Sequence, residues 1–365
     1  MKLHLIAGAR PNFMKIAPLW RGLVGHPFLR PSFVHTAQHC DDVMSLAIWR
    51  ELGLPDPDHV LNWEPAENSD PVEDMMRAYE ALCHTDRPDM VLVVGDVNSS
   101  RAAALVAAEM EILLVHLEAG LRCFDLDMPE EQNRIAIDHK ADLLLTPSAD
   151  ADQNLLAEGI EPGRIKLVGN IMADTLAMMR TQINQEDAAS KVGVNKGRYV
   201  LVTLHRPSNV DDPERLRQIC QAFKELAAEA EVCFVLHPRT QTRLAVQGLI
   251  KELSAAGVRL LPPMGYVRFA SLMRDAGVVV TDSGGVQEET SCLGVPCLTL
   301  RTSTERPITM TQGTNRLVEV DQLTHAVTSV LHASCDRARI PANIPVWDGK
   351  TASRVVRELE AFWRG

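Results

Sequence analysis

The segment 278–300, VVVTDSGGVQEETSCLGVPCLTL, constrains the fold of this chain more than any other part of the sequence. It begins with an apolar run typical of a buried parallel strand, breaks at Asp-Ser-Gly-Gly (282–285), continues as a helical segment, and ends at a second apolar strand. In such a unit the free N–H groups and the dipole of the helix N-terminus favour an anion, and the two glycines let a phosphate approach the backbone. Glu288 and Glu289 lie one turn further on, within reach of a ribose. The turn by itself is equally compatible with an ordinary βα connection.

Apolar strands alternate with helical segments along the rest of the chain. The patterns predict strands at 2–7, 32–36, 90–94, 112–116, 142–146, 165–169, 199–204, 232–236 and 258–261, and helices from about 16 and at 72–83, 213–228, 269–276 and 352–363. Strands that alternate with helices in two successive sets indicate an α/β fold made of two doubly wound, Rossmann-like domains.

The predicted domain boundaries rest on a change in composition in the middle of the chain. A polar, charged stretch at 178–196 is interpreted as helix plus interdomain linker. We therefore expect domains at 1–180 and 197–350, with a closing helix at 351–365 that packs back on the first domain. Ligand-binding loops would follow the carboxyl ends of the strands and face a shared cleft.

Composition narrows the range of partners. The 365 residues suffice for two domains, and a formal net charge of −11 argues against nucleic acid as the main partner. No apolar run approaches the roughly 18 residues that a membrane helix needs. The N-terminus is predicted to be a short strand rather than a signal peptide, so we expect a cytoplasmic protein with no membrane partner. The 8 cysteines include no CxxC pair, which favours reduced, buried thiols.

Polar residues gather at the predicted carboxyl ends of the strands, in segments whose other positions are apolar. They are Arg10, Lys15, Gln38, Asp96, Glu118, His205, His237, Ser283 and Arg306, with Glu130 and Arg134 close by at a helix start. The basic members suit a diphosphate, whereas carboxylates beside an anion are best explained as acids or bases. The pattern indicates an enzyme that binds a diphosphate and transfers protons.

Seven motifs occur in one order along nearly the whole chain: GARPNFMKIAP, VVGDVNSS, HLEAGLR, MPEEQNR, TLHRPSNVDDPERL, TDSGGVQEE and TERP. Together they resemble the non-hydrolysing UDP-N-acetylglucosamine 2-epimerase family. The resemblance implies a fold similar to the GT-B glycosyltransferases and the interconversion of UDP-GlcNAc with UDP-ManNAc. In that family UDP is eliminated to leave 2-acetamidoglucal, and it adds back after protonation on the other face of C2.

The resemblance also assigns roles to residues. It implies that Asp96, Glu118 and Glu130 handle protons and that His205 assists them. Substrate binding is implied for Arg10, Lys15, Gln38, Arg134, His237, Phe269, Ser283, Gly284, Gly285, Glu289 and Arg306. No metal or NAD is required, and the sequence has neither a GxGxxG after its first strand nor a His/Cys cluster at ligand spacing. We expect a UDP-sugar as the partner and a homodimer as the assembly.

The chain departs from the common bacterial version at 38–44, where it reads QHCDDVM. Many relatives have Gln-His-Arg there, followed by a Met-Leu-Asp segment, and in bacterial relatives the region helps to bind a second, regulatory UDP-GlcNAc. Losing the arginine and gaining two acids should weaken the capture of an anion. The resemblance therefore does not extend allosteric activation to this chain.

Several other functions are compatible with parts of this pattern. An epimerase of the same mechanism could act on a modified sugar, such as a UDP-diacetamido-uronic acid. A hydrolysing epimerase would release free ManNAc. A GT-B glycosyltransferase would share the nucleotide turn but needs only one base. A nucleotide-sugar-binding regulator would have no use for Asp96, Glu118 and Glu130.

Overall fold

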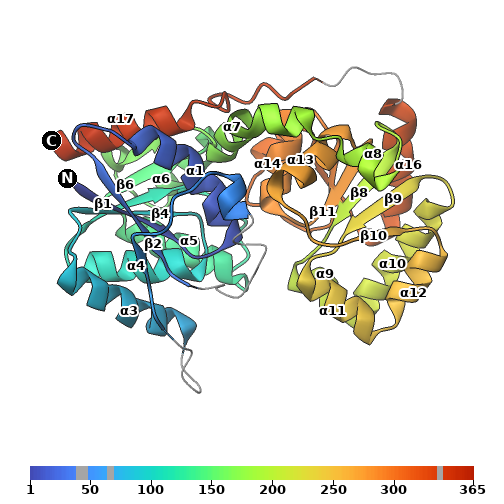
Figure 1. Ribbon diagram of the computed structural model, residues 1–365, viewed down its shortest axis with the longest axis horizontal. Helices are drawn as coiled ribbons and strands as arrows, with labels where there is room; N and C mark the ends of the chain where they lie inside the picture. Colours follow the sequence, from blue (N-terminus) through green and yellow to red (C-terminus); the bar gives the residue numbers. More distant parts are fainter. Residues whose placement is uncertain (38–47, 64–69, 335–339) are drawn as a thin grey trace. The chain divides into compact units, whose positions relative to one another are not determined.

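The computed structural model describes residues 1–37, 48–63, 70–334 and 340–365 of the chain. These residues form two compact units, coloured along the sequence in Figure 1. The first unit comprises Met1–Met178 and Pro345–Gly365, and the second comprises Met179–Ile344.

The first unit is built on a seven-stranded parallel sheet with the strand order β3-β2-β1-β4-β5-β6-β7. The strands are β1 (Lys2–Ala7), β2 (Arg30–His35), β3 (His59–Val60), β4 (Met90–Val94), β5 (Leu113–Leu117), β6 (Leu143–Thr146) and β7 (Ile165–Leu167). The order reverses between β1 and β4. Ligands of doubly wound sheets bind at such a reversal, beyond the carboxyl ends of the strands.

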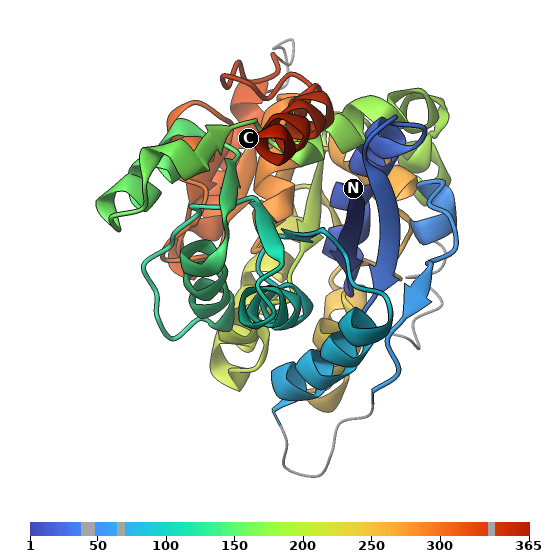
Figure 2. The same cartoon turned by 90° about the vertical axis from the view of Figure 1, so that its left-hand side faces the viewer.

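Helices cover both faces of this sheet (Figures 1 and 2). They are α1 (Arg10–Leu23), α3 (Pro71–Thr85), α4 (Asn98–Glu109), α5 (Pro129–Lys140), α6 (Ala149–Ala157) and α17 (Thr351–Arg364), with a 3-10 turn η1 (Pro162–Arg164). α3, α4 and α5 pack side by side on one face, and α17 packs on α1. The backbone N–H groups of Thr351 and Ala352 donate to the Asp174 carboxylate at 2.9 and 2.8 Å, which fastens the start of α17 to this unit.

α1 begins at Arg10, so the expectation of a helix only from about residue 16 is wrong. Pro11 is tolerated because the N–H that it lacks would have no partner within the first helical turn. The side-chain oxygen of Asn12 accepts from the backbone N–H of Ala9 at 3.2 Å, which supplies the cap that the sequence did not suggest. As a result Lys15 lies in the second turn of a helix rather than in a loop.

The second unit contains a six-stranded parallel sheet with the order β10-β9-β8-β11-β12-β13, which reverses between β8 and β11. Its strands are β8 (Tyr199–Thr203), β9 (Glu231–Val235), β10 (Arg259–Leu261), β11 (Val278–Thr281), β12 (Cys297–Thr299) and β13 (Asn315–Leu317). The unit expected at 278–300 is confirmed as β11, α14 (Gly284–Leu293) and β12.

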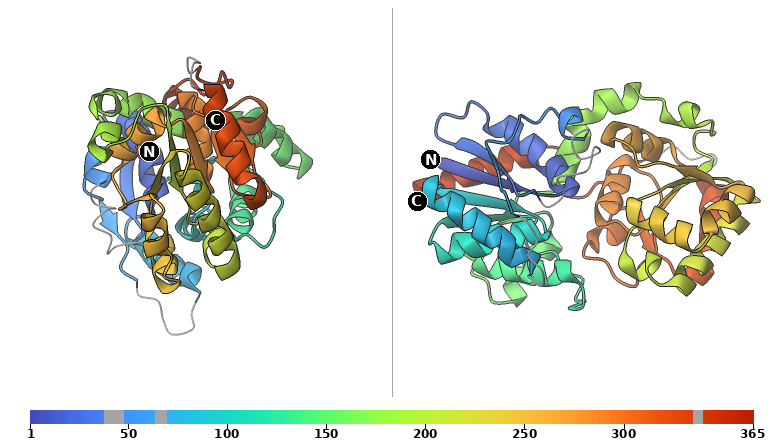
Figure 3. Two further views of the ribbon diagram at one scale, coloured as in Figure 1. Left: turned by 90° about the vertical axis from the view of Figure 1, so that its right-hand side faces the viewer. Right: turned by 60° about the horizontal axis from the view of Figure 1, so that its bottom comes forward.

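Helices line both faces of the second sheet (Figure 3). They are α8 (Ala188–Val192), α9 (Pro207–Val210), α10 (Pro213–Ala227), α11 (Pro238–Val246), α12 (Leu249–Ala255), α13 (Tyr266–Asp275), α14, α15 (Ile308–Thr311) and α16 (Leu323–Ser334), with a 3-10 turn η2 (Val320–Gln322). Val278 and Val280 join a core with α10 and α16, whereas Val279 joins a core with α8 and α13. Alternate residues of β11 are thus buried on opposite faces, as expected for a central parallel strand.

The boundary between the units lies within a helix, α7 (Ile171–Gln185), and the rest of the 178–196 stretch contains α8. The six cysteines that the structure describes are all free thiols, and five of them are buried. None of the described helices combines the length and the apolar character needed to cross a membrane.

Candidate active site

Lys15 and Glu118 form a buried ion pair at the carboxyl edge of the first sheet, with side chains 9% and 3% exposed. Lys15 comes from α1 and Glu118 directly follows β5. Gly95, which follows β4, makes room for the pair, because a Cβ there would lie 3.0 Å from Lys15 Nζ and 3.3 Å from Glu118 Oε2. The structure thus brings two predicted site residues together beside the strand reversal.

Glu118 has an uncommon backbone and an unsatisfied side chain. Its φ of +74° lies in the left-handed region, where a residue with a Cβ is strained. Its N–H donates to Leu145 O at 3.0 Å, which holds the turn. Oε2 meets Lys15, but Oε1 is buried with no hydrogen-bond partner. A buried carboxylate oxygen without a partner is costly in a resting protein and suits an atom that exchanges a proton with a ligand.

Asp96, after β4, is held by Arg134 of α5, whose Nη1 lies 2.5 Å from an Asp96 oxygen. Arg134 is 1% exposed and also pairs with Glu131 at 2.6 Å. Burial opposes the charge of Glu131, but its hydrogen bonds and charge pairing with Arg134 outweigh burial and lower its pKa. Asp96, Arg134 and Glu131 therefore form a chain of alternating charges, which fixes the orientation of Asp96.

Glu131, rather than the neighbouring Glu130, is the glutamate of α5 that joins this buried network. Glu130 lies on the same first helical turn and is partly exposed. Glu131 was not among the predicted site residues, although its spacing from Arg134 was a signal for this pair. A glutamate three positions before an arginine on a helix places the two side chains together.

His116 of β5, which was not among the predicted site residues, links the turn after β4 to α5. Its Nδ1 lies 2.6 Å from Asp138 of α5 and its Nε2 lies 3.1 Å from the carbonyl oxygen of Gly95. Asp138 also accepts from Arg122 at 2.7 Å. Burial would raise the pKa of Asp138, but the charges and hydrogen bonds of His116 and Arg122 lower it. This network ties the turns after β4 and β5 to α5.

In the second unit Asp282 holds the loop after β8 in place, at the point where the strand order reverses between β8 and β11. It is fully buried at the end of β11 and accepts from the backbone N–H groups of His205 and Arg206 at 3.1 and 3.0 Å. Its carboxylate also lies 3.0 Å from His205 Nδ1. Burial would raise the pKa of Asp282, yet the His205 charge and these hydrogen bonds lower it to about 2.

His205 is thus oriented by a buried carboxylate while its side chain remains 39% exposed. Because Nδ1 meets Asp282, Nε2 is the atom through which the ring can exchange a proton with a ligand. The ring of His237, after β9, lies beside it with centroids 5.5 Å apart. His237 caps α11 by accepting from Arg239 N at 3.3 Å.

The N-terminus of α14 carries the predicted anion site. Ser283 is its N-cap, and Gly284 and Gly285 form its first turn. A Cβ on Gly284 would lie 2.4 Å from Arg306 Nη1, so this glycine lets the guanidinium pack against the turn, whereas a Cβ on Gly285 would meet no atom within 4 Å. The predicted cation is therefore next to the predicted helix N-terminus.

Arg306 is 7% exposed and pairs with two glutamates, Glu288 at 2.6 Å and Glu305. Glu305 also pairs with Arg301 at 2.7 Å. Glu288, which the sequence places within reach of a ribose, is thus a partner of Arg306, and Glu305 was not predicted as one. These pairs leave the guanidinium oriented before any ligand arrives.

Glu289 is almost fully buried in α14, and burial raises its pKa to about 7, reinforced by the charge of Glu288 and opposed by a hydrogen bond with Tyr266. Phe269 lies on α13, partly buried against the same side of the sheet. Two predicted site features cannot be placed, because the side chain of Arg10 and the segment 38–44 with Gln38 lie outside the described residues.

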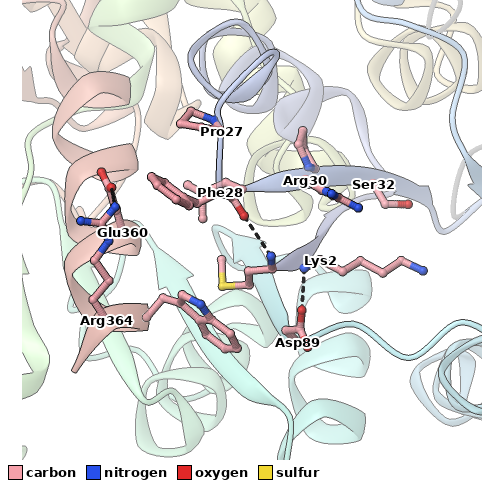
Figure 4. A pocket seen from close by; sticks show the side chains of 12 residues that line it. Lys2, Pro27, Phe28, Arg30, Ser32, Asp89, Glu360 and Arg364 are labelled. Carbon is pink, nitrogen blue, oxygen red and sulfur yellow. Dashed lines mark hydrogen bonds and ion pairs between the residues drawn. The ribbon is translucent and has the colours of Figure 1, made fainter.

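A pocket of about 720 Å³ lies away from all these residues, at the amino-terminal edge of the first sheet (Figure 4). Lys2, Phe28, Asp89, Trp363 and Arg364 contribute to its lining. It contains none of the predicted site residues, so this pocket is not part of the candidate active site.

Comparisons with known proteins place the chain in a family. Residues 22–360 match the family model described as UDP-N-acetylglucosamine 2-epimerase. The UDP-N-acetylglucosamine 2-epimerase of Methanocaldococcus jannaschii is 38% identical over 98% of this chain and 99% of the relative. The UDP-2,3-diacetamido-2,3-dideoxy-D-glucuronate 2-epimerase of Pseudomonas aeruginosa is 38% identical over 87% of this chain and 88% of the relative.

A crystal structure of the M. jannaschii UDP-GlcNAc 2-epimerase, in complex with UDP-GlcNAc and UDP, superposes with a TM-score of 0.90 at 36% identity, covering 99% of this chain and 100% of the other. The two doubly wound units are thus those of a GT-B-like fold. The chain belongs to the UDP-N-acetylglucosamine 2-epimerase family and is an isomerase.

Proposed function

We propose that this isomerase interconverts UDP-N-acetylglucosamine and UDP-N-acetylmannosamine by inverting C2 of the sugar. The proposal rests on the environment of Glu118. Glu118 is a buried carboxylate on a left-handed backbone, with one oxygen on Lys15 and the other without a partner. The full-length similarity to UDP-N-acetylglucosamine 2-epimerases supports the same conclusion.

The chemistry requires that the C1–O bond to UDP breaks before C2 is inverted. The C2 hydrogen is not adjacent to a carbonyl, so it becomes acidic only as UDP leaves with the bonding electron pair. Loss of the C2 proton to a base then gives 2-acetamidoglucal. Protonation of the opposite face of C2 and return of UDP to C1 complete the exchange, with no net change in atoms or electrons. No NAD or metal is needed.

The second unit supplies groups for the departing diphosphate. Arg306, the N-terminus of α14 and His237 would stabilise the negative charge that grows as the bond breaks. Ser283, Gly284 and Gly285 would approach a phosphate through the backbone. Glu289 would bind the ribose hydroxyls and Phe269 would contact the nucleotide. Arg10, Lys15 and Gln38 remain predicted substrate contacts.

The carboxylates Asp96, Glu118 and Glu130 would transfer the C2 proton, with His205 assisting through Nε2. Arg134 supports the reaction differently from the sequence prediction. Because it pairs with both Asp96 and Glu131, we assign it to orienting Asp96 rather than to binding the substrate. A homodimer and a cytoplasmic location remain predictions.

The second candidate is an epimerase of a UDP-diacetamido-uronic acid. It is favoured by one observation, a relative with that activity that is as similar in identity, 38%, as the M. jannaschii enzyme. Only the substituents at C3 and C6 of the sugar differ between the two substrates.

One experiment separates these functions. Proton NMR of UDP-GlcNAc incubated with the protein in deuterium oxide, without NAD or metal, should show UDP-ManNAc with deuterium at C2. The same incubation with the diacetamido-uronic acid substrate tests the second candidate. Free ManNAc would indicate a hydrolysing enzyme, and product that retains its protium at C2 would contradict the elimination route.

A further inference from the structure

Three side chains with metal-binding atoms meet at the amino-terminal edge of the first sheet. His4 lies in β1, His59 begins β3, and Asp86 follows α3. Among the residues that the structure describes, theirs is the one group of three or more His, Cys, Asp or Glu side chains whose ligand atoms all lie within 4.8 Å of one another. Asp96 and Glu118 follow the carboxyl ends of strands, so this group is at the opposite edge from the candidate active site.

The distances suit one small cation. Asp86 Oδ2 lies 2.8 Å from His59 Nε2 and 3.8 Å from His4 Nε2. A tetrahedral ion with bonds of roughly 2.0–2.1 Å holds its ligand atoms about 3.3 Å apart. One distance is shorter than that value and the other is longer, so side-chain shifts well below 1 Å would bring these ligand atoms to tetrahedral spacing.

His4 gives the strongest reason to expect an ion. Its ring is fully buried, and Nε2, the atom that faces Asp86, has no hydrogen-bond partner. Its Nδ1 lies 3.1 Å from the hydroxyl of Tyr79, which is also buried. Ligating histidines are commonly fixed in this way through their second nitrogen. A metal on Nε2 would satisfy a polar atom that the protein otherwise leaves unpaired.

Lys2 offers the main argument for a simpler interpretation. Its Nζ pairs with Asp86 Oδ1, and in this interpretation the aspartate serves only as an ion-pair and hydrogen-bond partner of Lys2 and His59. The lysine nevertheless engages only one oxygen and leaves Oδ2 to the two imidazoles. The simple ion pair also gives His4 Nε2 no partner.

We propose that His4 Nε2, His59 Nε2 and Asp86 Oδ2 bind a divalent transition-metal ion of the zinc class, with solvent as the fourth ligand. Two imidazoles and one carboxylate favour such an ion over magnesium or calcium, which prefer all-oxygen sites. The side chains of His59 and Asp86 are 28% and 33% exposed, which gives the ion and a solvent ligand access. The metal would link β1, β3 and the end of α3, at the edge of the sheet opposite the candidate active site.

The test uses the purified full-length chain, freed of metal with a chelator and titrated with zinc(II) in competition with a chromophoric chelator. We expect one equivalent to bind. His59→Ala and Asp86→Asn should each lower its affinity at least tenfold, since even residues behind metal ligands contribute about 10- to 100-fold. His84→Ala is the matched control, because His84 lies in the last turn of α3, close to Asp86 in the sequence, and its side chain is 67% exposed and faces Glu80.

Cobalt(II) provides a second readout that depends on geometry. The wild-type chain should show the intense visible bands of four-coordinate cobalt, and His59→Ala should not. Zinc should also raise the unfolding temperature of the wild type but not that of Asp86→Asn.

Lys2→Met distinguishes a metal site from a plain ion pair, because removing a cation beside the dication should tighten zinc binding. The proposal is overturned if wild type and His59→Ala bind zinc equally, if His84→Ala loses the same equivalent, or if Lys2→Met binds zinc no better than the wild type.

Discussion

Glu118 combines a strained backbone, almost complete burial and one unpaired oxygen. We expect Glu118→Gln to lower the epimerisation rate at least ~100-fold while UDP still binds, because the amide keeps the shape but cannot exchange the C2 proton. Steady-state kinetics and UDP calorimetry measure the two effects. Glu111→Gln is the control, since Glu111 is also left-handed, with φ +54°, but exposed. A Glu118→Gln enzyme at full speed would remove this residue from the mechanism.

Glu289 should make the folded protein less stable as pH rises, whereas an acid in a salt bridge makes it more stable. Its folded-state pKa of about 7 is above the usual value of 4.5. The folded chain therefore holds this proton more tightly than the unfolded chain, and stability decreases as pH rises from 4.5 through 7. Above pH 7 the full cost is present, on the order of 3 kcal/mol.

Glu289→Gln should remove that cost, raising the unfolding free energy at pH 8 by about 3 kcal/mol and changing it little at pH 4.5. Urea unfolding at the two pH values provides the measurement. The same substitution should weaken UDP binding if the carboxylate binds the ribose. Equal stabilisation at both pH values would show that the ionisation of Glu289 is not the source.

The first turn of α14 offers a matched pair of substitutions at the scale of one element. Gly284→Ala would force its Cβ into Arg306 and Glu305, at 2.4 and 2.5 Å, and should lower the unfolding free energy by about 1–3 kcal/mol. Gly285→Ala has open space around it, and alanine is the better helix former, so the free chain should be as stable as the wild type or slightly more stable.

UDP affinity should fall in both glycine variants, because a methyl group on either residue would keep a phosphate from the backbone of the turn. Calorimetry with UDP checks this. Full affinity in Gly285→Ala would mean that the diphosphate does not rest on the N-terminus of α14.

At the scale of the whole molecule, the chain forms two units, and its last helix returns to the first of them. Leu359 of α17 is fully buried, and so is Leu216 of α10 in the second unit. Each change to alanine should cost about 2–5 kcal/mol in the unit that contains it. Hydrogen exchange followed by mass spectrometry should show lost protection in α1 and β1 peptides for Leu359→Ala, and in β8 and β9 peptides for Leu216→Ala. Uniform loss across the chain in either variant would show that the units unfold together.

Local patterns in the sequence determined most of the fold. β1 and α10 lie within one residue of their predicted limits, because unbroken apolar runs, amphipathic periods and the Asp-Pro start of α10 are properties of adjacent residues. The same patterns predicted that Lys15, Asp96, Glu118 and His205 follow the carboxyl ends of strands. Topology then places strand ends at one edge of a parallel sheet.

Only the tertiary structure decided which of these residues contact one another. The adjacent glutamates of α5 look alike in sequence, but the rotation of the helix against the sheet puts Glu131 on Arg134 and leaves Glu130 partly exposed. Asp282 appeared to be a turn residue, yet the backbone of the His205 loop makes it the anchor of that loop. His4, His59 and Asp86 carry no spacing signal, because their proximity depends on how β1, β3 and α3 pack together rather than on any local pattern of the chain.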